Sequence, residues 1–482
     1  MVVIEQADPT GQLADYIAAA RYEHLPAHVV DAVKKSFLDT IGAGIAGRST
    51  EIGRIVTGMA RENGGKPQAA LWTEDARVPA AEAAFANAVM ARCRELDDVH
   101  EGSPRVGMGH GGHVNVMLVP AALATVESLR GPTSGRDLIA ALAVGGDLIP
   151  RLRMAAGNAG RLGWEGPTLA PFGVVATVAK LRGFDRTTTA SALGTAYAHC
   201  AGNILSTSDG TWDVWLNAGI AARSGMVSAE LARRGHKGAR SPFLGSSGLY
   251  PLYFRGEYHA DALLSALGKE FESGNVSIKP YSSCKATHHA IYTLQTLMAR
   301  HGIDEAAIDR IDVRTSDYNI RLAVLNEHGE PKHSPRNLNE AQFSIPFTMA
   351  AVAVRGSVFP DVFNDSILGD GRVRSLAGKI QVSPSAEKYA LASKEGYASA
   401  DVEVHLANGA TYAGCEPNVK GHPANPLSFD EVAEKFAKCL ALTDNAMPDR
   451  SADRRRRSAG RMRRRERDRA FAVTIVQREC RA

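Results

Sequence analysis

The densest group of residues that could do chemistry lies between positions 94 and 113. It holds four carboxylates and three imidazoles joined by a glycine-rich stretch: Glu95, Asp97, Asp98, Glu101, His100, His110 and His113. Crowded carboxylates and imidazoles shift one another's pKa toward neutrality, which suits general acid and base catalysis. They could also bind a divalent metal ion, but no HxH or HExxH spacing sets two ligands on one face. We favour acid–base chemistry, with capping and loop hydrogen bonding as an even alternative for Asp97 and Asp98.

A second candidate site is the segment 279–289, KPYSSCKATHH, which opens a predicted helix. Backbone N–H groups at a helix start, with Lys285 and His288 beside them, favour a bound carboxylate or phosphate. Cys284 could be a nucleophile beside His288, but no third group that would orient the pair is identifiable. We expect this segment to bind an anion, with His288 in anion binding or proton transfer.

Motifs for other kinds of chemistry are missing or lack their structural context. The six cysteines are scattered without a CxxC pair, so zinc ribbons and iron–sulfur runs are unsupported. Two GxGxxG matches, at 42–47 and 107–112, do not lie between a strand and a helix as a dinucleotide site requires. No GxxxxGK[ST] or GxSxG stretch occurs. The sequence predicts neither a metal nor a cofactor.

Most of the first 268 residues are predicted to form helices that position the 94–113 cluster. In the segment 27–47, Val29, Val33 and Phe37 recur at helical spacing, and glycines make its end plausible. Similar periodicity predicts helices over 79–90, 114–129, 135–155, 172–182, 187–200 and 218–234. Closely spaced small residues suit tight helix packing, so we expect a large all-helical domain over 1–268.

The pattern changes near residue 270 to that of a smaller α+β domain over 269–425. Alternating apolar and polar residues predict strands over 308–314, 379–382 and 400–405, the last joined by a turn to 411–413. Helical stretches over 288–300 and 340–354 lie between them. Ser428 and Glu431 form a capping box at the start of a helix over 428–442. We expect this helix, within the segment 426–445, to pack back on the first domain.

Length, composition and charge limit the class of protein. A chain of 482 residues exceeds what one core usually serves, and its 44% hydrophobic and 22% charged residues are ordinary for a globular protein. No apolar stretch reaches the length of a membrane span and no secretory signal is evident, so we expect a cytoplasmic protein with no membrane partner. The segment 446–482 is rich in arginine. We predict a disordered tail there rather than a nucleic-acid arm.

Several separate segments together resemble the MmgE/PrpD family. They follow in order over approximately residues 10 to 443: Glu95-Leu-Asp-Asp98, His113-Val-Asn, Pro120-Ala-Ala-Leu-Ala, Phe172-Gly, Lys279-Pro-Tyr-Ser-Ser-Cys with Thr287-His288, Glu340-Ala-Gln-Phe-Ser-Ile-Pro-Phe347 and Asn425-Pro-Leu-Ser. This family includes 2-methylcitrate dehydratase, cis-aconitate decarboxylase and iminodisuccinate epimerase. The resemblance implies a mainly α fold with a large helical domain, a smaller α+β lid domain and a site between them. It also implies a homodimer and cofactor-free chemistry beside substrate carboxylates.

The resemblance implies roles for single residues and reveals departures from the family pattern. The family's acidic stretch falls on 95–98, and its histidines fall on His113 and His288. Three positions differ: Glu165 stands where relatives carry histidine, Val214-Trp-Leu-Asn217 replaces Lys-Arg-Leu-His, and Phe347 replaces a tyrosine. The loss of two cations and the presence of two tryptophans indicate a substrate less anionic or bulkier than a tricarboxylate.

We predict a lyase that transfers a proton at the carbon α to a substrate carboxylate, with dehydration as the main prediction. The catalytic candidates are His113, oriented by Glu95 or Asp98, together with Glu165 as a second base and His288. The candidates for binding this small carboxylate are Asp97, His110, Lys279, Cys284, Lys285, Trp215 and Phe347. The alternatives are epimerisation of a substituted succinate, decarboxylation, and a catalytically altered family member that acts as a binding protein.

Overall fold

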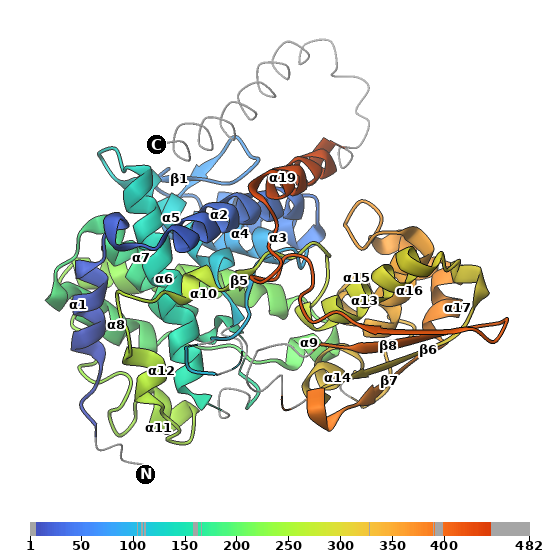
Figure 1. The fold of residues 1–482 in the computed structure, drawn as a ribbon. Helices are drawn as coiled ribbons and strands as arrows, with labels where there is room; N and C mark the ends of the chain where they lie inside the picture. Colours follow the sequence, from blue (N-terminus) through green and yellow to red (C-terminus); the bar gives the residue numbers. More distant parts are fainter. Residues whose placement is uncertain are drawn as a thin grey trace, which may run out of the picture.

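In this computed structural model, a larger helical part and a smaller part built on a β-sheet lie side by side (Figure 1). The structure describes residues 6–103, 105–107, 109, 112–157, 162–164, 166–326, 328–388, 390 and 399–444. The arginine-rich segment 446–482, predicted to be a tail, lies outside them. None of the helices in these ranges is long and apolar enough to cross a membrane.

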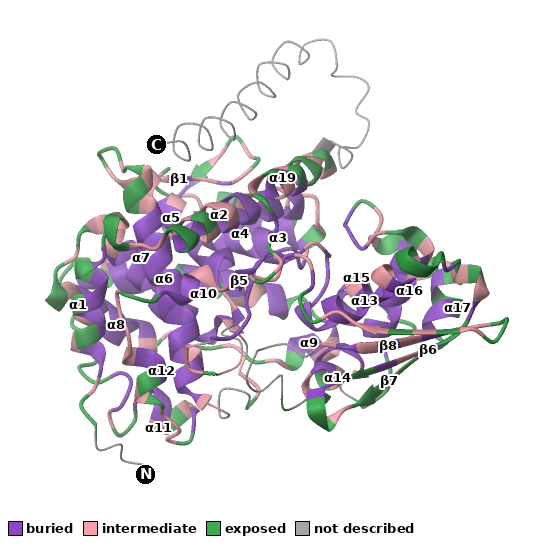
Figure 2. Ribbon diagram, in the orientation of Figure 1, coloured by how far each residue is buried: buried purple, intermediate pink, exposed green. Residues whose placement is uncertain are grey.

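In the described residues, the helical part contains twelve consecutive α-helices and one that returns from near residue 440. They are α1 (Thr10–Ala19), α2 (Ala27–Gly47), α3 (Glu51–Asn63), α4 (Ala80–Arg92), α5 (Asn115–Ser128), α6 (Gly135–Ala155), α7 (Ala170–Arg182), α8 (Arg186–Tyr197), α9 (Leu205–Asp209), α10 (Asp213–Arg233), α11 (Leu249–Tyr253), α12 (Ala260–Leu264) and α19 (Phe429–Asp444). Helix α4 contacts α2, α3, α5 and α10. Its residues are therefore nearly all buried, as Figure 2 shows for the centre of this part.

Small residues let these helices approach closely. A Cβ added to Gly47, at the end of α2, would lie 1.9 Å from the carbonyl oxygen of Met90 in α4. Gly44, one turn earlier, faces the ring of Trp72 in the same way. The glycine pattern over 42–47 thus serves helix packing, which agrees with our rejection of it as a nucleotide-binding motif.

Gly47→Ala is expected to lower the midpoint of thermal unfolding, because overpacking of this kind costs about 1–3 kcal/mol. The matched control is Gly58→Ala in α3, where an added Cβ would meet nothing within 4 Å. That change is expected to stabilise the protein by about 0.5–1 kcal/mol, because alanine is the better helix former. Differential scanning calorimetry of both variants checks the prediction, and equal midpoints would contradict it.

The smaller part is a four-stranded sheet covered by helices. Its elements are α13 (Lys285–His301), β6 (Ile308–Thr315), α14 (Asp317–Ala323), α15 (Leu338–Gln342), α16 (Ile345–Arg355), α17 (Gly371–Ala377), β7 (Ile380–Pro384), β8 (Asp401–Leu406) and β9 (Thr411–Cys415). The strand order is β7-β6-β8-β9, with β6 and β7 parallel and the other pairs antiparallel. Ile308, Ile311 and Val313 of β6 are buried. Helix α13 contacts β8 and β9, and α16 contacts β7, so these helices cover the apolar face (Figure 1).

The predicted class, mainly α with a smaller α+β domain, is confirmed, and two details differ. The predicted helix over 340–354 is two helices, because the Ser344 side chain accepts a hydrogen bond from the Phe347 N–H and caps α16. Strands also occur within the first 268 residues: β1 (Ala69–Ala70), β2 (Arg77–Val78), β3 (Val99–His100) and β4 (Gly112–His113). Two-residue strands leave no alternation for a sequence to reveal. Short 3₁₀ turns complete the described elements, at Tyr22–His24, Gly166–Leu169, Glu272–Gly274, Glu305–Ala307 and Asp365–Gly369.

A small sheet and a long helix connect the two parts. Strand β3 pairs with β4 on one side and with β5 (Val276–Ser277), which precedes α13, on the other. Helix α19 packs on α2, with Phe436 against Leu38. It begins with the predicted capping box, in which Ser428 and Glu431 each accept the other's backbone N–H, at 3.1 and 2.7 Å. The division at residue 268 stays a prediction.

Candidate active site

A cavity of about 60 Å³ lies between the helical part and the smaller part. The helical part contributes Arg92, Glu95, Gly112, His113, Arg153, Gly163, Trp164, Gly166, Ile204 and Thr207 to its wall. The smaller part, which we call the lid, contributes Cys284, Lys285, Tyr318, Leu322 and Phe343. Both candidate segments of the sequence therefore meet at one cavity.

His113 lies on the wall between a carboxylate and a guanidinium. Its Nδ1 is 2.6 Å from Oδ2 of Asp97, and its Nε2 is 3.1 Å from Nη2 of Arg92. A guanidinium can only donate hydrogen bonds, so Nε2 must be the acceptor and carries no proton. Nδ1 then carries the proton and donates it to Asp97. This hydrogen-bond network assigns a neutral imidazole whose basic nitrogen accepts from Arg92, and both residues line the cavity.

Two buried cations and two buried carboxylates surround this histidine. Arg92 is paired with Glu95 and lies 3.4 Å from Asp97. Lys279 lies 3.0 Å from Glu95 and 3.7 Å from Asp97. Burial alone would raise the pKa of both carboxylic acids, but the charges of Arg92 and Lys279 outweigh it and hold both values below their ordinary range. Both acids are therefore ionised, and the four charges cancel.

The backbone around this cluster explains which acid reaches His113. Glu95 adopts a left-handed conformation, with φ of 50°, and its N–H donates to the carbonyl of Arg92. This conformation is unusual for a residue other than glycine, and here it turns the chain sharply after α4. Asp98 accepts hydrogen bonds from the backbone and side chain of Asn115, at 3.0 and 2.5 Å, and so anchors the start of α5. The prediction that Glu95 or Asp98 orients His113 is corrected: Asp97 does.

The lid side of the cavity begins a helix, as predicted. Cys284 is the N-cap of α13 and Lys285 its first residue, and both line the cavity. The Lys285 ammonium is 2.5 Å from Glu101 and 3.1 Å from the Ser277 hydroxyl. Burial would raise the pKa of Glu101, but Lys285 outweighs it and lowers the pKa to about 2. The positive end of the helix dipole therefore faces the cavity beside an ion-paired lysine.

Cys284→Ser is expected to leave turnover within a few-fold of the unchanged protein. Burial raises the pKa of the Cys284 thiol to about 11, so the thiolate is almost absent near neutral pH. Serine keeps the size and hydrogen-bonding capacity of the side chain. Steady-state kinetics and alkylation by iodoacetamide check this, and a loss of more than about 10²-fold would restore the nucleophile hypothesis.

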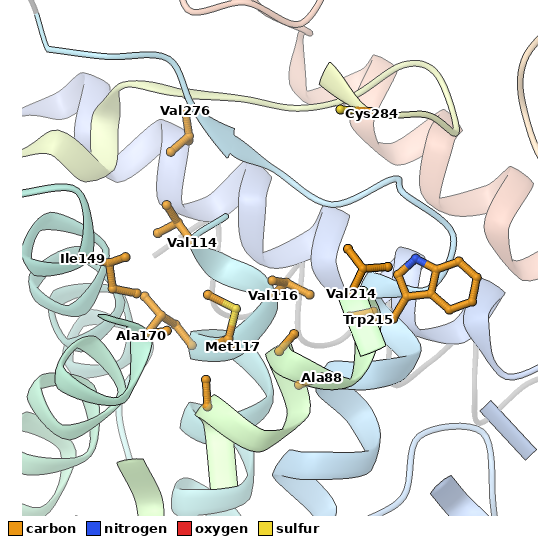
Figure 3. Close-up of a cluster of buried hydrophobic side chains, with 14 of the residues drawn as sticks. Ala88, Val114, Val116, Met117, Ile149, Ala170, Val214, Trp215, Val276 and Cys284 are labelled. Atoms are coloured by element: carbon orange, nitrogen blue, oxygen red, sulfur yellow. The ribbon is translucent and has the colours of Figure 1, made fainter. Parts of the chain in front are cut away.

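Several predicted residues are not on the cavity wall. His288 is fully buried, its Nε2 donates to the Ser283 carbonyl at 3.2 Å, and burial together with Lys285 and Lys279 lowers its pKa well below the usual value. It is therefore neutral and cannot balance an anion. Trp215 lies with Val214 in the hydrophobic cluster of Figure 3, and Phe347 packs on Phe363 inside the lid. His110 and Glu165 lie outside the described residues.

Arg92, Arg153 and Tyr318 are among the cavity residues that the sequence did not predict for the site. Arg92 carried a signal, because a charged residue ending an alanine-rich, buried helix three positions before Glu95 needs a partner. Arg153, which donates to the carbonyl of Trp164 at 3.3 Å, and Tyr318 carried none. Their positions depend on how the two parts meet.

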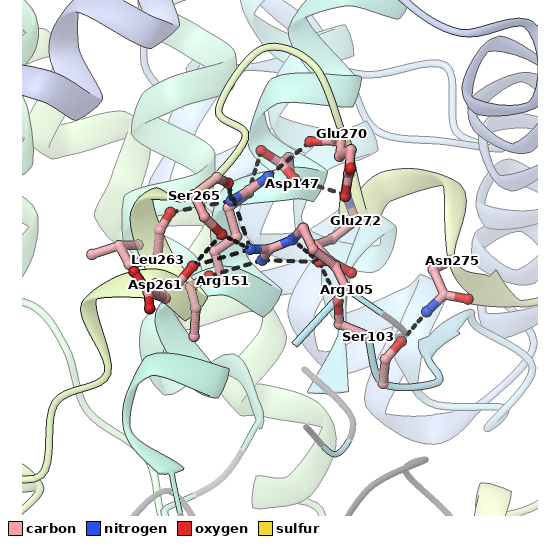
Figure 4. A network of polar contacts seen from close by, with 12 residues as sticks. Ser103, Arg105, Asp147, Arg151, Asp261, Leu263, Ser265, Glu270, Glu272 and Asn275 are labelled. Carbon is pink, nitrogen blue, oxygen red and sulfur yellow. Dashed lines mark hydrogen bonds and ion pairs between the residues drawn. The ribbon is translucent and has the colours of Figure 1, made fainter. Parts of the chain in front are cut away.

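A buried polar network that includes Arg105, Asp147 and Glu272 is shown in Figure 4. Asp147 accepts from Arg151 and from the backbone of Glu272, at 2.8 and 2.7 Å. Glu272 in turn pairs with Arg105 and with His100 of β3. A larger hollow of about 510 Å³ borders this network, but it contains none of the predicted site residues. Among the described residues, no group of three or more His, Cys, Asp or Glu side chains is placed to hold a metal ion.

Comparison with known proteins identifies the family of this chain. The sequence profile of the MmgE/PrpD N-terminal domain matches residues 11–261, and that of the MmgE/PrpD C-terminal domain matches residues 281–459. The chain belongs to the MmgE/PrpD family. The family resemblance drawn from the sequence is thereby confirmed.

Relatives in this family share about a quarter of their residues with the chain. The cis-aconitate decarboxylase-like protein oryM of Aspergillus oryzae is 26% identical over 450 residues, which cover 90% of each chain. The cis-aconitate decarboxylase of Homo sapiens is 24% identical over 435 residues, covering 89% of this chain and 86% of that protein. The cis-aconitate decarboxylase of Aspergillus terreus is 26% identical over 321 residues, covering 63% and 64%. These relatives carry the names of lyases.

Proposed function

We propose that this MmgE/PrpD protein is a lyase that transfers a proton at the carbon next to a substrate carboxylate, with His113 carrying the proton. The observation that supports this most directly is the neutral imidazole of a residue on the cavity wall, whose Nε2 accepts from Arg92 while Asp97 holds Nδ1–H. A buried carboxylate stabilises the imidazolium that forms when Nε2 takes a proton. No step of this proposal requires a cofactor or metal.

The substrate carboxylate would bind between Arg92 and the start of α13. Arg92 and Lys285, the first residue of α13, both line the cavity, and charge-assisted hydrogen bonds to carboxylates are the stronger kind. When the carboxylate accepts the hydrogen bond from Nη2–H of Arg92 in place of His113, the lone pair of His113 Nε2 becomes available to the substrate. Substrate binding and release of the base would thus be one event.

Two outcomes of this chemistry are compatible with the site. In dehydration, Nε2 removes the α-proton, the electron pair forms the double bond, and the β-hydroxyl takes a proton from solvent and leaves as water. The basic form of His113 favours this reaction. In decarboxylation, His113 first takes a proton from solvent water, the bond to the carboxylate breaks, carbon dioxide leaves, and His113 delivers that proton to the carbon. The names of the relatives favour this second reaction.

Epimerisation, in which the proton returns to the opposite face, and a binding role without turnover remain alternatives. A homodimer and a cytoplasmic location also stay predictions. Sedimentation of the purified chain would test the homodimer.

Proton NMR in D₂O tests the proposed function. The enzyme would be incubated with 2-methylcitrate, cis-aconitate, and amino- and aryl-substituted succinates. We expect solvent deuterium at an α-carbon or a product vinyl carbon in at least one of them. Release of carbon dioxide identifies decarboxylation, a new alkene with all carbons retained identifies dehydration, and inversion alone identifies epimerisation. Binding of these acids without exchange or product would favour the binding protein instead.

A further inference from the structure

Lys332 is a buried lysine of the lid that lies one layer behind the cavity. Lys332 is only 4% exposed. Its ammonium donates hydrogen bonds to the carbonyls of Phe343 and Leu322, at 3.3 and 3.5 Å. Both of those residues line the cavity. The lysine therefore connects the end of α14 to the break between α15 and α16, and these segments form the lid's wall.

The backbone of Lys332 is held as firmly as its side chain. Its N–H donates to the carbonyl of Val324 at 2.7 Å. Its own carbonyl accepts from the hydroxyl of Ser344 at 2.7 Å, the same side chain that caps α16. The ammonium thus has little freedom to move toward solvent.

The charge of Lys332 has no carboxylate to balance it among the described residues. Arg92 and Lys279 are balanced by Glu95 and Asp97, and Lys285 is balanced by Glu101. Near Lys332, the charged or titratable groups are Glu340, already paired with Arg336, and the neutral thiol of Cys284. Burial lowers the pKa of Lys332 to about 8. Burying a cation without an anionic partner costs folding free energy, which indicates a functional role for Lys332.

We propose that Lys332 is a positioning residue whose ammonium supplies the lid's positive charge for a carboxylate in the cavity while it holds Leu322 and Phe343 against that carboxylate. This inference rests on the proposed function, since it requires an anionic substrate. The carbonyl dipoles of Leu322 and Phe343 stabilise the cation while the cavity is empty, and the carboxylate supplies the missing negative charge when it binds.

Binding of inert acids at different pH values tests this proposal. Succinate and tricarballylate, which carry two and three carboxylates but no leaving group, would be titrated calorimetrically from pH 6.5 to 9.5. For the unchanged protein we expect the dissociation constant to rise above about pH 8, by up to about tenfold per unit, as Lys332 loses its proton. Lys332→Met is expected to bind roughly tenfold more weakly at pH 7 and to lack this rise. Lys379→Met, which removes a lid lysine bonded to the Ile308 carbonyl, is the matched control and should behave as the unchanged protein.

A measurement without ligand guards against misfolding of the variant. Because the folded pKa of Lys332 lies below its ordinary 10.5, the unfolded chain holds the proton to higher pH, and stability should rise between about pH 8 and 10.5. We expect this rise in the unchanged protein and not in Lys332→Met. Equal binding and equal pH dependence in both proteins would overturn the proposal for Lys332 and leave the proposed function standing. Absence of binding by the unchanged protein would overturn both.

Discussion

Replacing His113 with alanine is expected to lower kcat by about 10²–10⁴-fold while the fold stays intact. The imidazole supplies the proposed base on the cavity wall, and its side chain is only 12% exposed, so solvent cannot readily take its place. The charges of the buried ions around it balance one another, and the neutral ring adds no charge to that balance. Little stability should therefore be lost when the ring is removed. Turnover by NMR and the melting profile by circular dichroism check both halves of the expectation.

The matched control for this variant is His405→Ala. His405 also pairs with an aspartate, lying 3.0 Å from Asp312, but it is on β8 of the lid sheet. Loss of that histidine should leave kcat unchanged. A fully active His113→Ala protein would remove His113 from the mechanism, and equal losses in both variants would show that the effect is structural.

The second large effect is expected from Asp97→Asn. Ionised Asp97 accepts the Nδ1 proton of His113, which leaves Nε2 free to act as the base. An asparagine amide can donate to Nδ1 instead, so the proton moves to Nε2 and the base is lost. Where a catalytic histidine depends on an aspartate in this way, the same replacement lowers kcat by roughly 10⁴-fold. We expect a loss on the order of 10³-fold or more, seen mainly in kcat.

Asp98→Asn separates this effect from a general disturbance of the cluster. Asp98 is as buried as Asp97, but it binds Asn115 at the start of α5 rather than His113. Its replacement should lower the thermal midpoint and leave the turnover of folded protein nearly unchanged. If Asp98→Asn lost as much turnover as Asp97→Asn, the assignment of Asp97 as the orienting acid would be wrong.

The chemistry-bearing segments could be predicted because local sequence carries their signals. The acids and histidines over 94–113 stand together in the chain, and the segment 279–289 precedes a periodic helix. The capping box at Ser428 depends only on residues three positions apart. Most helices likewise follow from apolar spacing, although α10 begins five residues before the predicted start, at Asp213. Such features can be predicted without knowing which distant residues are in contact.

The order of contacts inside the site could not be predicted from local sequence. Asp97, Asp98 and Glu95 are alike in type and lie within four positions of one another, and only the folded chain places Asp97 against His113. Trp215 and Phe347 were expected to contact substrate, but both are buried in the hydrophobic core. Large apolar side chains are more often found there. Lys332 gave no signal, because its partners are backbone carbonyls of separate segments.

The sequence by itself determined the family, the mainly α class and the kinds of side chain available for acid–base chemistry. It could do so because periodicity, capping and motif order are properties of short stretches of chain. Only the tertiary structure decided that Asp97 orients His113, that Arg92 and Lys279 neutralise the acids, and that Lys332 lies behind the lid's wall. The contact of Lys279 with Glu95 joins segments 184 residues apart. All of these relations arise from burial and charge balance in the folded chain.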